Sequence, residues 1–95
     1  MNMIVTNSAV DRNLIIAIAE HDCSRYEIIL VKDEQDKSVV ISIPNLFVSL
    51  RTNCIMSGDK KLSIQYKLLE HNILPGDAKA IEEIINDIIN MYEFL

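Results

Sequence analysis

The side chains best suited to chemistry in this sequence are two cysteines and two histidines that lie far apart along the chain. They are His21, Cys23, Cys54 and His71, with Asp22 between the first two. Two Cys and two His side chains can hold zinc, but none of these residues has the short paired spacing that structural zinc sites use. We therefore expect no metal site, and interpret residues 21–23 as a polar connection between two elements.

A cysteine beside a histidine can also act as a nucleophile with its base. Neither cysteine is surrounded by a recognisable nucleophile signature, and a catalytic site also needs a sizeable concave pocket. Gly58 and Gly76 are isolated turn glycines, so the glycine-rich loop that cradles a nucleotide phosphate is absent from the sequence. The sequence predicts a protein without catalytic residues or a cofactor, and we treat a small enzyme as the third hypothesis.

Carboxylates gather in the last segment, where Glu82, Glu83, Asp87 and Glu93 follow one another within residues 77–95. On an exposed helix face nothing raises the pKa of a carboxyl group toward neutrality, which disfavours acid–base catalysis. The segment holds five acidic residues and one basic residue, and much of the net charge of −5 comes from it. Such a face can steer and dock a basic protein surface. These four residues are our predicted partner-binding set; the alternative is a solvated face that only keeps the protein soluble.

The overall charge disfavours several other partners. The sequence pI is about 4.8, whereas nucleic-acid binding usually needs a basic patch. The longest early apolar run, residues 14–19, is too short to span a bilayer. Two cysteines without a CxxC motif fit a reducing compartment, and the N-terminus lacks the pattern of a signal peptide. We expect a cytoplasmic protein that contacts neither nucleic acid nor membrane directly.

Length and composition predict a single domain over residues 1–95. Hydrophobic residues make up 49% of the chain and aromatic residues only 5%, so the core must be aliphatic. The abundance of Ile and Asn is typical of an AT-rich bacterial or phage gene.

The C-terminal segment shows the clearest helical pattern. Pro75-Gly76-Asp77 should start the helix, with Asp77 as its N-cap. Apolar residues then recur at spacings of three and four, as an amphipathic helix requires. They are Ile81, Ile84, Ile85, Ile88, Ile89, Tyr92 and Leu95.

Strands are predicted in the middle of the chain. Apolar and polar residues alternate over Lys61–Leu68, which indicates a strand after a turn at 57–60. Its hairpin partner would be Phe47–Met56, although a short helix over Leu46–Asn53 after Pro44 is an alternative.

Two further strands, Arg25–Lys32 and Ser38–Ile43, should flank a polar turn at 33–37. Both are apolar on each face, so each should be a central strand or lie at an interface. Residues 9–20 are ambiguous: Ser8 to Asp11 match a capping box, which favours a helix, while Asn13–Glu20 could instead form a strand.

The expected fold is α+β, an antiparallel sheet of about four strands with the C-terminal amphipathic helix packed on one face and a short N-terminal helix beside it. The expected function is that of a small acidic protein-binding factor, an inhibitor, immunity or counter-defence protein that blocks a basic partner surface. The alternative is a secretion-chaperone-like or assembly-accessory protein that acts as a homodimer. The two-sided apolar character of the central strands is the reason to expect a homodimer.

Overall fold

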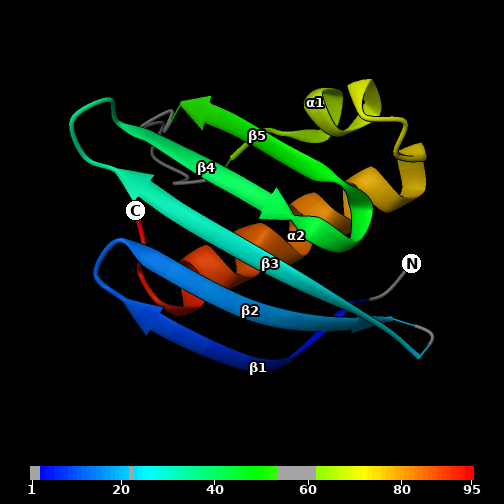
Figure 1. The fold of residues 1–95 in the computed structure, drawn as a ribbon, viewed down its shortest axis with the longest axis horizontal. Coiled ribbons are helices and arrows are strands. Elements are labelled where there is room, and N and C mark those ends of the chain that lie inside the picture. Colours follow the sequence, from blue (N-terminus) through cyan, green and yellow to red (C-terminus); the bar gives the residue numbers. More distant parts are fainter. Residues whose placement is uncertain (1–2, 22, 54–61) are drawn as a thin grey trace.

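A five-stranded antiparallel sheet forms the body of the protein (Figure 1). The computed structural model describes residues 3–21, 23–53 and 62–95. Its elements are β1 (Ile4–Asp11), β2 (Leu14–His21), β3 (Ser24–Asp33), β4 (Ser38–Ile43), the 3-10 turn η1 (Pro44–Leu46), β5 (Val48–Asn53), α1 (Gln65–Glu70) and α2 (Pro75–Met91). The strands lie side by side in chain order, each antiparallel to the next. The α+β class is as predicted, but the sheet has five strands where about four were expected.

The N-terminal helix predicted over residues 9–20 is wrong. This segment is a hairpin, in which Val10 pairs with Ile15 and Asp11 pairs with Leu14 across the turn between β1 and β2. Isoleucine suits a pleated surface better than a helix, and alternate residues of β2 are buried in the sheet core. The apparent capping box is therefore the end of β1, and the strand alternative for residues 13–20 is close to the observed β2.

The central hairpin matches its prediction. β3 and β4 cover the two predicted strands and flank a turn over residues 34–37. Both are central strands, because β3 lies between β2 and β4, and β4 lies between β3 and β5. The alternative of a helix over Leu46–Asn53 is wrong: only the short turn η1 follows Ile43, and β5 occupies most of that range.

The strand predicted over Lys61–Leu68 is also wrong where the structure describes it. Residues 62–64 have no regular structure and α1 begins at Gln65. The alternation arose because Leu62, Ile64 and Leu68 are all buried. The backbone N–H groups of Leu62 and Ile64 bond to side chains of α2, so this segment docks on a helix. Lys61, and the turn predicted at 57–60, lie outside the described residues.

The C-terminal helix is confirmed, with different ends. It begins at Pro75, where a proline is well tolerated because the first helical N–H has no acceptor in the helix. Asp77 lies in the first turn, and the N-cap is Leu74, which makes no side-chain cap bond. The apolar stripe is buried at Ile81, Ile84, Ile85, Ile88 and Ile89. Tyr92 follows the last helical residue and Leu95 lies past the end.

Helix α2 crosses one face of the sheet (Figure 1). Its isoleucines form one core with the residues of β2 to β5 that point to this side. Ala17 and Ala19 of β2 are fully buried there, and such small side chains allow the helix to approach the sheet.

Beyond the helix, Phe94 is buried and its carbonyl oxygen accepts a hydrogen bond of 2.8 Å from Nζ of Lys32. Tyr92 contacts Ser8 of β1 through their hydroxyl groups.

Candidate protein-binding surfaces

Three of the four predicted partner-binding residues lie together on the outer side of α2. Glu82, Glu83 and Asp87 line one shallow depression with a volume of about 400 Å³. Its other lining residues are Gln65, Lys79, Asn86 and Asn90. One helix face positions this group, because residues three and four apart along a helix are neighbours. A shallow polar depression of this kind suits contact with side chains of a protein better than enclosure of a small molecule.

Glu93 lies apart from the other three. It follows the end of α2 with a left-handed backbone, φ 49°, and lines a second depression with Ile89, Asn90 and Leu95. Asn90 lines both depressions, so the two adjoin. We call the exposed residues Glu83, Asp87 and Glu93 the acidic face.

Glu82 has a structural role that the sequence did not reveal. Its Oε2 accepts hydrogen bonds from the backbone N–H groups of Ile64 (2.8 Å) and Gln65 (3.2 Å), and its Oε1 accepts one from Nε2 of Gln65 (3.0 Å). The first N–H groups of a helix have no partner within it, and here the carboxylate of another helix supplies one. Glu82 is therefore partly occupied in holding the start of α1.

The acidic face itself is available for contact. Glu83, Asp87 and Glu93 are exposed, and among the residues described here none of them forms an ion pair with a basic side chain. A basic partner could pair with these carboxylates without breaking existing contacts. The structure keeps this surface accessible, as binding to a partner requires.

A second surface is the sheet face opposite α2, which we call the open face. The strand register places six apolar side chains next to one another there: Leu14, Ile16, Ile18, Ile29, Val31 and Val40. Among the described residues no helix crosses this face, as Figure 1 shows for α1 and α2. Ile16 and Val31 are 37% and 40% exposed. We call these six residues the open-face patch.

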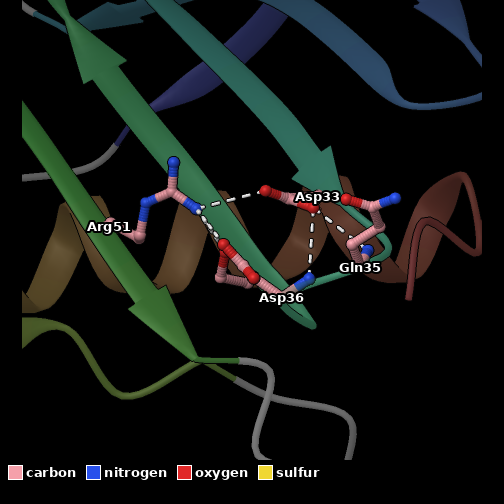
Figure 2. Close-up of polar contacts among 5 residues, drawn as sticks. Asp33, Gln35, Asp36 and Arg51 are labelled. Atoms are coloured by element: carbon pink, nitrogen blue, oxygen red, sulfur yellow. Dashed lines mark hydrogen bonds and ion pairs between the residues drawn. The ribbon is translucent and has the colours of Figure 1, made fainter.

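Charged side chains surround the open-face patch: the register places Asp11 beside Leu14 and Glu27 beside Ile18, and both arginines of this face lie next to carboxylates. Arg25 lies directly across from Glu20 in the register, with Nε 3.5 Å from Oε1. At the other end, Nη1 of Arg51 lies 3.4 Å from Oδ2 of Asp33 and 3.7 Å from Oδ2 of Asp36, and Figure 2 shows this cluster. The same nitrogen donates to Oγ of Ser38 at 2.7 Å. Each arginine is thus neutralised within the sheet.

The cluster around Asp33 also fixes the turn between β3 and β4. Oδ1 of Asp33 accepts the backbone N–H groups of Gln35 (3.0 Å) and Asp36 (3.2 Å) (Figure 2). The bond from the Asp36 N–H, helped by Arg51, lowers the pKa of Asp33 below its ordinary value of 3.8. Hydrogen bonds to an ionised carboxylate stabilise that form. This carboxyl group is ionised at neutral pH and serves the turn.

The cysteines and histidines are not brought into one described cluster. Cys23 is exposed at the β2–β3 turn, His21 ends β2, and Nδ1 of His71 bonds to the Lys67 carbonyl oxygen at 2.8 Å. Asp22 and Cys54 lie outside the described residues. Within the described ranges no three His, Cys, Asp or Glu side chains gather closely enough to hold a metal ion.

Comparison with known proteins adds no relative. No protein-family model matches the chain, and no curated protein or solved structure shows significant similarity to it. In residues 3–21, 23–53 and 62–95 there is no helix with the length and apolar character that crossing a membrane requires. Fold and surfaces together define a small acidic α+β protein in which the described helix α2 lies on one face of the sheet.

Proposed function

We propose that this protein is a non-enzymatic protein-binding factor, an inhibitor or counter-defence protein that covers a basic surface of its partner with the acidic face. The observation that carries the proposal is the placement of Glu83, Asp87 and Glu93. Glu83 and Asp87 are exposed on the side of α2 opposite its buried isoleucines, and Glu93 is exposed just past the end of the helix, so a partner can reach all three without disturbing the core.

Charge supports a basic partner. The chain carries −5 overall and its last segment, residues 77–95, holds five acidic residues against Lys79 alone. Complementary charge accelerates encounter and selects partners more than it adds affinity. Binding should therefore weaken as salt rises, because a Debye length of about 10 Å at 0.1 M screens exposed charges.

Blocking is the mechanism that this surface can perform. The depression on α2 is shallow and its lining is largely polar, so it offers contacts to a protein surface and little enclosure for a reacting group. A partner whose active or nucleic-acid-binding surface is basic would be occluded by the bound helix.

The first experiment is to identify the partner by co-purification from the native host, with mass spectrometry of the bound proteins. The second compares association rates for the wild type and for the triple variant E83Q/D87Q/E93Q at several salt concentrations. We expect slower association and a flatter salt dependence in the variant. The control variant is Glu82→Gln, which removes one negative charge at the position that caps α1; it should lower stability and change the salt dependence less.

The opposite result is equally clear. An unchanged association rate and an unchanged salt slope in the folded triple variant would mean that the acidic face is only a solvated surface. The partner would then dock elsewhere, and the open face is the next candidate.

A second function, an assembly-accessory or secretion-chaperone-like protein acting as a homodimer, is favoured by the open-face patch. A homodimeric chaperone needs an apolar contact surface between its subunits, and the patch supplies such surface on the side of the sheet that α2 leaves bare. A stoichiometric complex with an extended, apolar client segment would support this function over blocking.

A further inference from the structure

We infer that the open face is the contact surface between two copies of this chain, which stack sheet against sheet with their α2 helices on the outside. This inference concerns a different surface from the acidic face and does not depend on the proposed function. It rests on the side-chain register of the sheet, on the charges at its rim and on the area available.

The register makes the centre of the open face continuously apolar. Across the strands, Leu14 pairs with Val31 and Val31 with Val40, and in the next row Ile16 pairs with Ile29. Ile18 extends the patch along β2. An antiparallel sheet with one wet face usually alternates apolar and polar residues, and β2 breaks that rule. Clustered apolar surface of this kind marks an interaction site.

Two arginines at the rim of the open face offset part of its negative charge, which reduces the repulsion between two copies. Two chains that each carry −5 repel one another, but here Arg25 is paired with Glu20 and Arg51 with Asp33 and Asp36. The open face is thus less acidic than the outer side of α2. In a stack of two sheets the acidic faces point outward, far from one another, and stay accessible to a basic protein.

The area of the face reaches the lower bound for a specific interface. Five strands about 4.8 Å apart, with about eight residues at ~3.3 Å each, give a face of roughly 500 Å². Two such faces in contact remove about 1,000 Å² in total from water, the lower limit for a specific interface. Sheets commonly stack in this way, about 10 Å apart, with interdigitating side chains.

A single two-fold axis relates the two copies, because the open-face patch of one copy contacts the same patch of the other. A partner with a strongly basic surface would instead be drawn to the acidic face, whose carboxylates form no ion pair with any basic side chain that the structure describes. The charge pattern therefore separates the two surfaces: the acidic face for a different protein and the open face for a second copy.

The test measures mass in solution by sedimentation equilibrium over a wide range of protein concentration. We expect the wild type to dimerise with little weakening at high salt, because apolar burial is not screened. The variant I16K/V31K should raise the dissociation constant at least ~100-fold, because it forces two ammonium groups into an apolar contact. The matched control F47K/L74K makes the same chemical change at residues that are 94% and 69% exposed and lie outside the strands of the sheet; it should dimerise like the wild type.

A second variant and a second measurement keep the result interpretable. I16T/V31T keeps β-branched side chains that suit strands and serves if the lysine variant fails to fold. In the wild type, isoleucine methyl NMR at increasing concentration should shift Ile16, Ile18 and Ile29 and leave the core residues Ile81 and Ile85 unchanged.

Three outcomes would overturn the inference. One is a wild type that stays monomeric at the highest concentration. Another is a folded I16K/V31K or I16T/V31T variant that dimerises as tightly as the wild type. The third is a concentration-dependent shift at Ile4 of the edge strand β1 without one at Ile16 or Ile29, which would indicate pairing of sheet edges. Dimerisation of the E83Q/D87Q/E93Q variant should be unaffected, so failure here is distinguishable from failure of the proposed function.

Discussion

The side-chain amide of Asn86 forms two hydrogen bonds with the main chain of Leu62: its Oδ1 accepts the N–H at 2.8 Å and its Nδ2 donates to the carbonyl oxygen at 3.0 Å. Asn86 is buried on α2, between the isoleucine stripe and the acidic face. Together with Glu82, one turn earlier, it holds the extended segment 62–64 against the helix. The polar side of α2 is therefore partly an internal surface.

Replacing Asn86 by Ala should lower the free energy of unfolding by about 2–4 kcal/mol, because two buried main-chain groups lose their partners. Urea unfolding followed by circular dichroism measures the change. The control is Asn90→Ala, at an exposed site on the same helix, where a change within about 0.5 kcal/mol is expected. Equal stability in the two variants would show that the bonds to Leu62 contribute nothing.

Replacing Ile85 by Asp should unfold the protein. Ile85 is fully buried, and an unpaired charge there costs several kcal/mol, which rivals a total stability of about 5–15 kcal/mol. Thermal unfolding is the measurement, and Met91→Asp is the matched control because Met91 is 62% exposed. A normal melting temperature in Ile85→Asp would contradict the packing of α2 on the sheet.

The turn between β3 and β4 should be sensitive to acid. Because the Asp36 N–H and Arg51 lower the pKa of Asp33 below 3.8 in the folded protein, folding favours the ionised carboxylate. This stabilisation is present above pH 3.8 and is lost as the pH falls through the lower, folded-state pKa. A carboxyl-detected NMR titration should report a pKa below 3.8 for Asp33.

The variant Asp33→Asn tests the cause of that acid sensitivity. Asparagine keeps an oxygen for the turn amides but has no charge for Arg51, so stability should depend less on pH below 3.8 than in the wild type. Asp33→Ala removes both contacts and should be less stable than Asp33→Asn at neutral pH. A titration of Asp33 at or above 3.8 would contradict the assigned bonds.

Cys23 should tolerate replacement by Ser. The side chain is exposed at a turn, so the free energy of unfolding should change by no more than about 0.5 kcal/mol, and partner binding should be kept. Elemental analysis of the purified protein is the second measurement. Stoichiometric zinc in the wild type that disappears in Cys23→Ser would make Cys23 a ligand and overturn the interpretation.

The sequence correctly predicted those elements in which apolar residues follow one clear pattern. In α2 the isoleucines return every three or four residues, so a single helical face is apolar wherever the helix packs. β3 and β4 were equally clear, since two β-branched runs flank a polar turn that must reverse the chain. The acidity of the last segment is likewise a property of composition, and its exposure follows from the opposite position of the isoleucines.

Residues 9–20 and 61–68 were predicted wrongly because their local patterns fit two structures. A capping-box match before an apolar run favours a helix, yet β2 is a strand because pairing with β1 and β3 satisfies its backbone and buries Ile15, Ala17 and Ala19. Around residue 64, alternation suggested a strand, but the partners of its N–H groups are Glu82 and Asn86, about twenty residues later. Hydrogen bonds between distant segments are decided only when the chain is folded.

The acidic face and the open face also differ in how far the sequence predicts them. That Glu83 and Asp87 are exposed could be predicted from helical periodicity. That Glu82 caps α1 depends on how α2 docks against the segment before α1. That six apolar side chains of three strands meet on a face that no described helix crosses depends on strand order and register. Residues seventeen positions apart, such as Leu14 and Val31, become neighbours only through the meander. Composition thus determined an acidic protein with an aliphatic core, while tertiary structure decided which apolar residues enter that core and which stay on the surface.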